Sequence, residues 1–141
     1  LIVADLDHFK TINDQYGHAM GDRVIAEFAR GLVSAMGPGA IAGRLGGEEF
    51  AVLLPLANLN GARLFAEAIR SARLPIDGLR VTASFGVAQR LEGEDLEQLI
   101  HRGDEALYEA KHNGRNCVRL ARAAQAAAMP HKRPVLFRPL Q

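Results

Sequence analysis

The chain has 141 residues, of which 48% are hydrophobic, enough to bury the core of one globular domain. Its 17 basic and 16 acidic residues are intermixed and give a net charge of +1, which argues against polymeric nucleic acid as a partner. No apolar run approaches the ~20 residues of a membrane span, so we expect this part of the chain to make no membrane contact.

Residues 1–4 form a short apolar run that predicts a buried strand, and Asp5-Leu6-Asp7 follows at its end. Alternate residues of a strand share a face, so Asp5 and Asp7 should point to the same side if the extended form continues that far. In residues 22–36 apolar side chains recur at helical spacing and stop at a Gly-Pro-Gly sequence, which predicts an amphipathic helix.

Two strand-like runs, residues 41–45 and 50–54, flank Gly46-Gly47. A Gly-Gly pair between two strands predicts a tight hairpin whose turn needs positive φ. The two carboxylates that follow, Glu48 and Glu49, are therefore expected at the hairpin tip.

The remaining pattern predicts a helix at 60–73, a strand at 81–87, a helix that begins near Asp95 with Gly114 as its C-terminal cap, and a strand at 118–120. The residues expected to face the core are Leu64, Phe65 and Ile69 on the first helix and Leu96, Leu99, Ile100, Gly103, Leu107 and Ala110 on the second. We assign residues 1–120 to one domain and residues 121–141 to a tail, Ala-rich to residue 129 and then Pro-rich, basic and flexible. This order of elements predicts an α+β fold with a central mixed, mainly antiparallel sheet flanked by helices.

The single cysteine, Cys117, cannot form an internal disulfide, which suits a reducing compartment and leads us to expect a cytoplasmic location. The sequence opens without Met and directly in an apolar run. We therefore expect it to be part of a longer protein, which could itself be bound to a membrane.

The carboxylates of Asp5, Glu48 and Glu49 lie on strand ends that can converge, and grouped carboxylates ionise together only when a cation neutralises them. Oxygen ligands select a hard divalent ion such as Mg²⁺, which commonly binds a substrate's phosphates as well. A nucleoside triphosphate and a two-metal displacement are the expected substrate and chemistry. The alternative is that these are ordinary solvated turn and loop residues, which would be favoured for either motif alone.

The sequence Gly46-Gly47-Glu48-Glu49-Phe50, with Asp5-Leu6-Asp7 upstream, resembles the GGDEF domain of diguanylate cyclases, in a Glu-for-Asp form that is also active in that family. The resemblance covers nearly all of residues 1–120. It implies a fold like that of nucleotide cyclases and polymerase palms, and the condensation of two GTP molecules into cyclic di-GMP with release of pyrophosphate. It also implies two Mg²⁺ or Mn²⁺ ions in each active site, a homodimer of facing domains, and an upstream sensory or receiver domain.

The same resemblance assigns roles residue by residue. The implied metal ligands are Asp5, the carbonyl of Leu6, Glu48 and Glu49, with Glu48 also accepting the proton of the 3′-hydroxyl, whereas Asp7 has no firm role. Phe9 and Lys10 are implied to surround the phosphates, with Lys10 as a transition-state stabiliser. Asn13 and Asp22 are implied to bind the guanine edge, and His18 and the backbone of Gly46 and Gly47 are further implied substrate contacts. Lys111 and Arg115, four apart at a helix end, are the implied phosphate cations. Taken singly, simpler interpretations stay open: Asn13 as a turn residue, Asp22 as an N-cap, and Lys111 and Arg115 as complements of the helix dipole.

Two departures from the family matter. The family carries a helix with an LTxLxNR-like segment before the first strand, and its absence from this sequence predicts weak GTP binding if it is truly missing. Many cyclases also bind their product at an Arg-x-x-Asp site that ends five residues before the Gly-Gly pair. The matching residues here are Gly37-Pro38-Gly39-Ala40, so both charged anchors are gone.

Two other functions compete with a cyclase. The first is a catalytically silent GTP-binding module that regulates a neighbouring domain, which the presence of Glu48 and Glu49 argues against. The second is a sugar transferase that uses Asp5-Leu6-Asp7 to bind a metal and a diphosphate, but this would leave the Gly-Gly-Glu-Glu-Phe hairpin unexplained.

Overall fold

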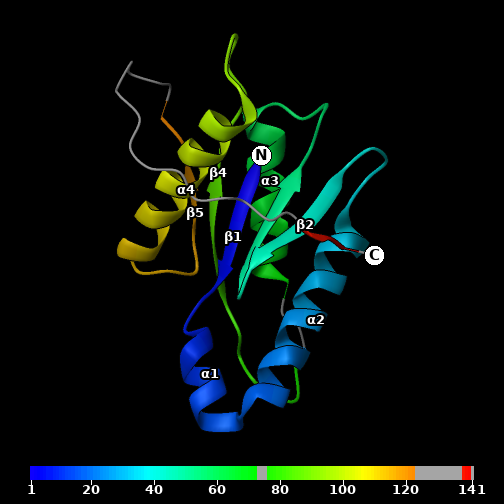
Figure 1. Ribbon diagram of the computed structural model, residues 1–141, viewed down its shortest axis with the longest axis vertical. Helices are drawn as coiled ribbons and strands as arrows, with labels where there is room; N and C mark the ends of the chain where they lie inside the picture. Colours follow the sequence, from blue (N-terminus) through cyan, green and yellow to red (C-terminus); the bar gives the residue numbers. More distant parts are fainter. Residues whose placement is uncertain (73–75, 123–137, 141) are drawn as a thin grey trace.

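The computed structural model of the protein describes residues 1–72, 76–122 and 138–140. Figure 1 shows a twisted sheet with helices packed around it. The elements in chain order are β1 (Ile2–Leu6), α1 (Phe9–Tyr16), α2 (His18–Ala35), β2 (Ile41–Gly46), β3 (Glu49–Leu53), α3 (Leu59–Ser71), β4 (Ala83–Val87), α4 (Leu96–His112), β5 (Val118–Leu120) and β6 (Arg138–Pro139).

The strands form one sheet in the order β5-β4-β1-β3-β2-β6. Every neighbouring pair is antiparallel except β4 and β5, which run parallel. The predicted α+β fold with a mixed, mainly antiparallel sheet is therefore confirmed. Among the helices of the described residues, none is long and apolar enough to cross a membrane.

The alternation of side chains along β1 divides the core into two layers. Ile2, Ala4 and Leu6 belong to one cluster together with buried side chains of α2 and α3. Leu1, just before β1, and Val3 belong to a second cluster with buried side chains of α4. Because alternate residues face opposite sides, Asp5 is placed on the face that α4 covers.

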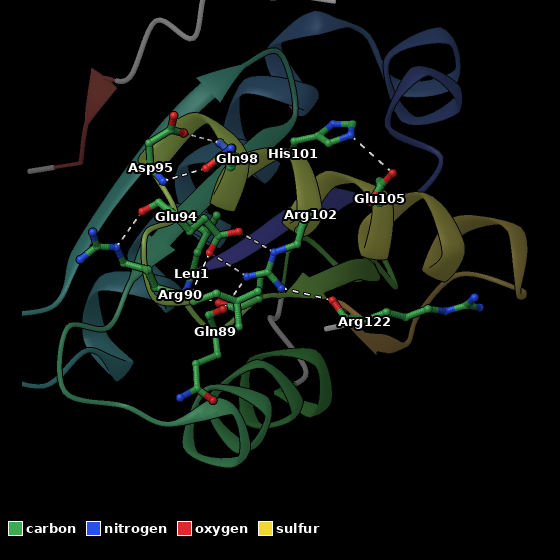
Figure 2. A network of polar contacts seen from close by, with 12 residues as sticks. Leu1, Gln89, Arg90, Glu94, Asp95, Gln98, His101, Arg102, Glu105 and Arg122 are labelled. Carbon is green, nitrogen blue, oxygen red and sulfur yellow. Dashed lines mark hydrogen bonds and ion pairs between the residues drawn. The ribbon is translucent and has the colours of Figure 1, made fainter. Parts of the chain in front are cut away.

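A buried ion pair fastens the loop between β4 and α4 (Figure 2). Arg102 of α4 donates to both carboxylate oxygens of Glu94, at 2.6 and 2.8 Å. It also donates to the carbonyls of Gln89 and Arg122. Glu94 accepts a further bond from the backbone of Leu91, so the pair joins the loop, the helix and the chain after β5.

Several boundaries and orientations differ from the sequence predictions. The helix α1 was not predicted, and α2 begins at His18, so Asp22 lies inside a helix and is not an N-cap. Two of the residues predicted to face the core are exposed, Leu64 of α3 at 53% and Leu96 of α4 at 57%, whereas the others predicted on these helices are buried or half-buried. The predicted Ala-rich and basic tail lies mostly outside the described residues. Near its end, the strand β6 was not predicted, and it pairs with β2.

Candidate active site

Asp5 and Glu49 come from adjacent antiparallel strands and are direct partners in the register of β1 and β3. Directly opposite residues project to the same face of a sheet, so both carboxylates are on the side covered by α4. Asp5 is buried, with 5% of its surface exposed, and Glu48 and Glu49 are half-buried. Two of the predicted strand ends thus converge as expected.

The hairpin is confirmed, but its turn is shifted by one residue. Gly46 pairs with Glu49, so the two turn residues are Gly47 and Glu48 rather than Gly46 and Gly47. Gly47 has the positive φ of 47° that a tight turn needs. The tip is fixed from both sides, because Arg44 Nε donates to the Gly47 carbonyl at 2.7 Å and the Leu6 amide donates to the Glu48 carbonyl at 3.3 Å.

Asp5 has a cationic partner within the chain. Lys111 Nζ, from the last turn of α4, lies 2.7 Å from Asp5 Oδ2. Burial raises the pKa of Asp5 above its usual value, the Lys111 hydrogen bond and charge lower it, and the charges of Glu48 and Glu49 raise it further. The carboxylate therefore lies where a nearby positive charge favours its ionised form.

The oxygen donors of this site suit a hard divalent ion, but they do not form a closed cage. Within residues 1–72, 76–122 and 138–140, no group of three or more His, Cys, Asp or Glu side chains is arranged to hold a metal. Asp5, Glu48 and Glu49 nevertheless provide carboxylates of the kind that Mg²⁺ prefers, next to the backbone of Leu6. An ion at Asp5 would compete with the ammonium group of Lys111.

Asp7 is also on this face, yet it has a different environment from Asp5. It is 4% exposed and accepts hydrogen bonds from Thr82 Oγ1, Ser84 Oγ and the Asn116 amide, at 2.7, 2.6 and 2.9 Å. Ser84 is the register partner of Asp5, which places both aspartates on the same face as the alternation predicted. Sequence reasoning missed the three partners of Asp7, although a serine within an otherwise apolar strand is a usable signal.

The predicted substrate-binding residues that lie on α1 and α2, below the end of β1, are Phe9, Lys10, Asn13, His18 and Asp22 (Figure 1). Phe9 packs in the core, whereas Lys10, His18 and Asp22 are exposed. The helix α1 begins at Phe9 without a side-chain cap. Its first backbone N–H groups are free of intrahelical partners, an arrangement that favours phosphate.

Asn13 and Gly21 form the contact between α1 and α2. Asn13 Oδ1 is buried and has no hydrogen-bond partner among the described residues. A Cβ atom at position 21 would overlap with this oxygen, so only glycine leaves room for it. Gly21 was missed by sequence reasoning, and an unpaired buried acceptor is a group that a ligand donor could satisfy.

Arg115 does not continue the face of α4 that carries Lys111. The helix ends at His112, and Arg115 follows in the left-handed region with φ of 61°. Its amide donates to the Ala110 carbonyl at 3.0 Å, which closes the end of the helix. Arg115 is therefore an exposed turn residue just beyond the helix end that carries Lys111, and its role as a phosphate cation stays a prediction.

Comparison with known proteins gives a consistent result. The family described as "Diguanylate cyclase, GGDEF domain" matches residues 1–117. Diguanylate cyclase VdcA of Vibrio cholerae serotype O1 is 47% identical over 127 residues, covering 84% of this chain and 38% of that protein. Diguanylate cyclase DgcM of Escherichia coli K12 is 47% identical over 121 residues, covering 84% of this chain and 30% of that protein. The chain thus spans only about a third of the length of these relatives.

Solved structures resemble the fold closely. The active GGEEF domain of a diguanylate cyclase from Vibrio cholerae superposes with a TM-score of 0.79 at 34% identity, covering 87% of this chain and 82% of that one. The GGDEF domain of DgcB from Caulobacter crescentus, solved in complex with c-di-GMP, gives a TM-score of 0.78 at 37% identity, covering 85% of this chain and 75% of that one.

Proposed function

Because the chain belongs to the GGDEF family of diguanylate cyclases, we propose that it is a catalytic domain that condenses two GTP molecules into cyclic di-GMP and releases pyrophosphate. The observation that carries the proposal is the placement of Asp5 opposite Glu49, with Glu48 on the adjoining hairpin turn. These are the carboxylates that the catalytic members of the family use, and all of them are present.

Asp5, the Leu6 carbonyl, Glu48 and Glu49 would hold two Mg²⁺ or Mn²⁺ ions. Ions bound there would neutralise the phosphates and lower the pKa of the attacking hydroxyl. Glu48 accepts the proton of the 3′-hydroxyl, because it is on the exposed turn where a second substrate can approach. Lys111, which contacts Asp5, supplies a cation for phosphates bound beside that strand end.

The remaining residues bind and orient GTP. Lys10, at the start of α1, stabilises the charge that develops on the phosphates, and Arg115 adds a second cation with a planar donor set. Asn13 and Asp22 contact the guanine edge. The N1 and N2 donors of guanine suit an aspartate acceptor, whereas adenine would leave that acceptor without a partner.

A single domain provides one set of these residues and so holds one GTP. We propose that two copies face each other as a homodimer, so that each 3′-hydroxyl attacks the α-phosphate held by the other copy. The length of the relatives supports a further sensory or receiver domain that controls this encounter. GTP as substrate favours a cytoplasmic location.

The proposal is tested by incubating the full-length protein with Mg²⁺ and either GTP or a nucleotide sugar, and identifying the products by chromatography and mass spectrometry. Cyclic di-GMP from GTP is expected. Glu48→Gln should lower the rate by at least ~10²-fold, the scale of removing a key transition-state stabiliser, without changing the melting temperature. Glu92→Gln, an exposed residue outside the site, is the matched control.

Other outcomes assign other functions. Tight GTP binding without any product would identify a regulatory GTP-binding module. Turnover of the nucleotide sugar would identify a transferase. Wild-type turnover by a folded Glu48→Gln protein would refute the catalytic assignment of Glu48.

A further inference from the structure

The buried carboxylate of Asp7 joins three segments that are far apart in the sequence. Its donors are Thr82 before β4, Ser84 within β4 and Asn116 in the turn after α4. Each bond is charge-assisted when the carboxylate is ionised, and together they use both carboxylate oxygens. Asp7 is thereby engaged by three donors, whereas the partner of Asp5 is the ammonium group of Lys111.

The turn that Asp7 holds has an unfavourable backbone conformation. Arg115 and Asn116 have φ values of 61° and 43°, a region that residues other than glycine populate sparsely. Such a conformation persists only when surrounding contacts hold it. The Arg115 amide is bound by the Ala110 carbonyl, and the Asn116 amide is bound by Asp7 Oδ2 at 2.9 Å.

We propose that Asp7 is a positioning residue. Its carboxylate fixes the turn of Arg115 and Asn116 against the strand end that carries Asp5 and Leu6, so that the Arg115 guanidinium reaches the triphosphate bound there. This inference rests on the proposed function for the identity of the bound anion. It separates the two aspartates of the Asp5-Leu6-Asp7 sequence, because Asp5 binds cations and Asp7 organises an anion-binding turn.

The hydrogen-bond chemistry at Asp7 provides a pair of informative variants. Asparagine can keep its oxygen at the Oδ2 position, toward Thr82 and the Asn116 amide, while its NH₂ group donates to the Ser84 hydroxyl, which can also accept. Asp7→Asn should therefore preserve the turn. Alanine offers no acceptor, so Asp7→Ala leaves the Asn116 amide without its partner.

The first measurement is hydrogen exchange of the full-length protein, read on peptides that contain residues 114–117. Asp7→Ala should speed exchange of the Asn116 amide by at least ~10-fold, the factor expected for the loss of one charge-assisted hydrogen bond, and Asp7→Asn should leave it near the wild-type rate. This readout does not depend on catalysis. Unchanged exchange in Asp7→Ala would overturn the proposal even if the protein is a cyclase.

The second measurement is a double-mutant cycle with Arg115 on GTP turnover, or on the Kd for GTP if the protein proves not to turn GTP over. Asp7→Ala should raise KM for GTP by roughly 10-fold, the cost of one charge-assisted contact, with little change in kcat. In the Arg115→Ala background the same substitution should add almost nothing, because the two residues act through one contact. Additive losses would show that Asp7 does not act through Arg115.

The third measurement separates positioning from metal binding. Asp7→Asn should need the same Mg²⁺ concentration for half-maximal turnover, or for half-maximal GTP binding, as the wild type. A shift of that concentration to higher values would assign Asp7 to the metal and overturn the proposal. Because Asp7→Asn keeps the hydrogen bonds, this result decides the matter even if Asp7→Ala fails to fold.

Discussion

Lys111 Nζ lies 2.7 Å from Asp5 Oδ2, so the chain itself supplies a positive charge beside the most buried of the three carboxylates Asp5, Glu48 and Glu49. We expect Lys111→Met to bind Mn²⁺ more tightly in the absence of nucleotide, because a competing cation is removed. The gain should be roughly fivefold, the size of a partly exposed ion pair worth about 1 kcal/mol.

Calorimetry with Mn²⁺ on the nucleotide-free protein measures this affinity. Arg119→Gln removes an exposed positive charge from β5 and serves as the control. Equal or weaker Mn²⁺ binding by Lys111→Met would show that the ion does not share Asp5 with the lysine.

Gly21→Ala should separate stability from ligand binding. The added methyl group must displace Asn13 Oδ1, while the Phe9 ring lies 3.0 Å away. Alanine stabilises a helix by up to about 1 kcal/mol relative to glycine, which offsets the cost of displacing the Asn13 side chain. We therefore expect little net change in the melting temperature. GTP affinity should fall by roughly 10-fold, since a displaced amide loses a hydrogen bond to the base.

The control for this prediction is Gly61→Ala in α3, where the nearest atom to the new Cβ is 3.5 Å away and fits without displacement. Its GTP affinity should equal that of the wild type. Unchanged GTP binding by Gly21→Ala would remove Asn13 from the base pocket.

Asp22→Ala tests recognition of guanine. The carboxylate is exposed on α2 and free to accept from a bound base. We expect GTP binding to weaken by at least ~10-fold and ATP binding to change far less, because only guanine has the donors that Asp22 would accept. Competition binding with both nucleotides measures the ratio, with Asp14→Ala on α1 as the control. Equal losses for both would exclude a contact with the base edge.

The loop at residues 37–40 lacks the charged side chains that would bind the product, cyclic di-GMP. An open depression of about 240 Å³ lies here, lined by Gly37, Pro38, Ala40 and the apolar segment 54–57. It offers no charged side chain to a cyclic dinucleotide, whose binding should lose several charge-assisted bonds of roughly 1.5–3 kcal/mol each. Micromolar cyclic di-GMP should therefore not inhibit through this loop.

Charged residues can be introduced into this loop without a clash, because nothing lies within 4 Å of a Cβ atom built at Gly37. Gly37→Arg with Ala40→Asp should create inhibition by cyclic di-GMP, whereas either change alone should not. Tight product binding to the wild type that is lost on changing this loop would contradict the prediction.

Arg102→Met should destabilise the fold by about 3–5 kcal/mol, because it leaves Glu94 buried without its cation. Only 8% of Glu94 is exposed, and Arg102 supplies two of its hydrogen bonds. Adding Glu94→Leu should recover part of the loss, since no buried charge then remains. Urea unfolding of the two variants and the wild type measures these differences, and equal instability of the single and double variants would contradict the ion-pair explanation.

The ion pair of Glu94 and Arg102 also predicts how the stability of the fold depends on pH. The hydrogen bond from Arg102 is the main cause that holds the pKa of Glu94 below its usual value. When the pKa of a carboxyl is lower in the folded protein than in the unfolded chain, its ionised form stabilises the fold. This stabilisation is complete above the pKa in the unfolded chain, about 4.3 for Glu, and is lost as the pH falls through the pKa in the folded protein. Urea unfolding of the wild type should therefore show this contribution decline as the pH falls below about 4.3, and the stability difference from Arg102→Met should narrow as the pH falls.

Local patterns predicted most of the sheet, because its strands are apolar runs bounded by glycine or by charge. They did not predict α1, whose eight residues include few apolar ones. Neither could they predict the partners of Asp7, since Thr82, Ser84 and Asn116 are 75 to 109 positions away along the chain. Contacts of this kind depend on the register of β1 with β4 and on the end of α4, which only the folded chain specifies.

The pairing of β6 with β2 has a consequence for how two copies can meet. β6 occupies the outer edge of β2 at Gly43 and Arg44, where free backbone groups would otherwise be a template for a strand from another molecule. Pro139 in the outer position has no N–H to extend the ladder further. Pairing of two copies into one continuous sheet through this edge is thus disfavoured, and so is an amyloid-like continuation from it.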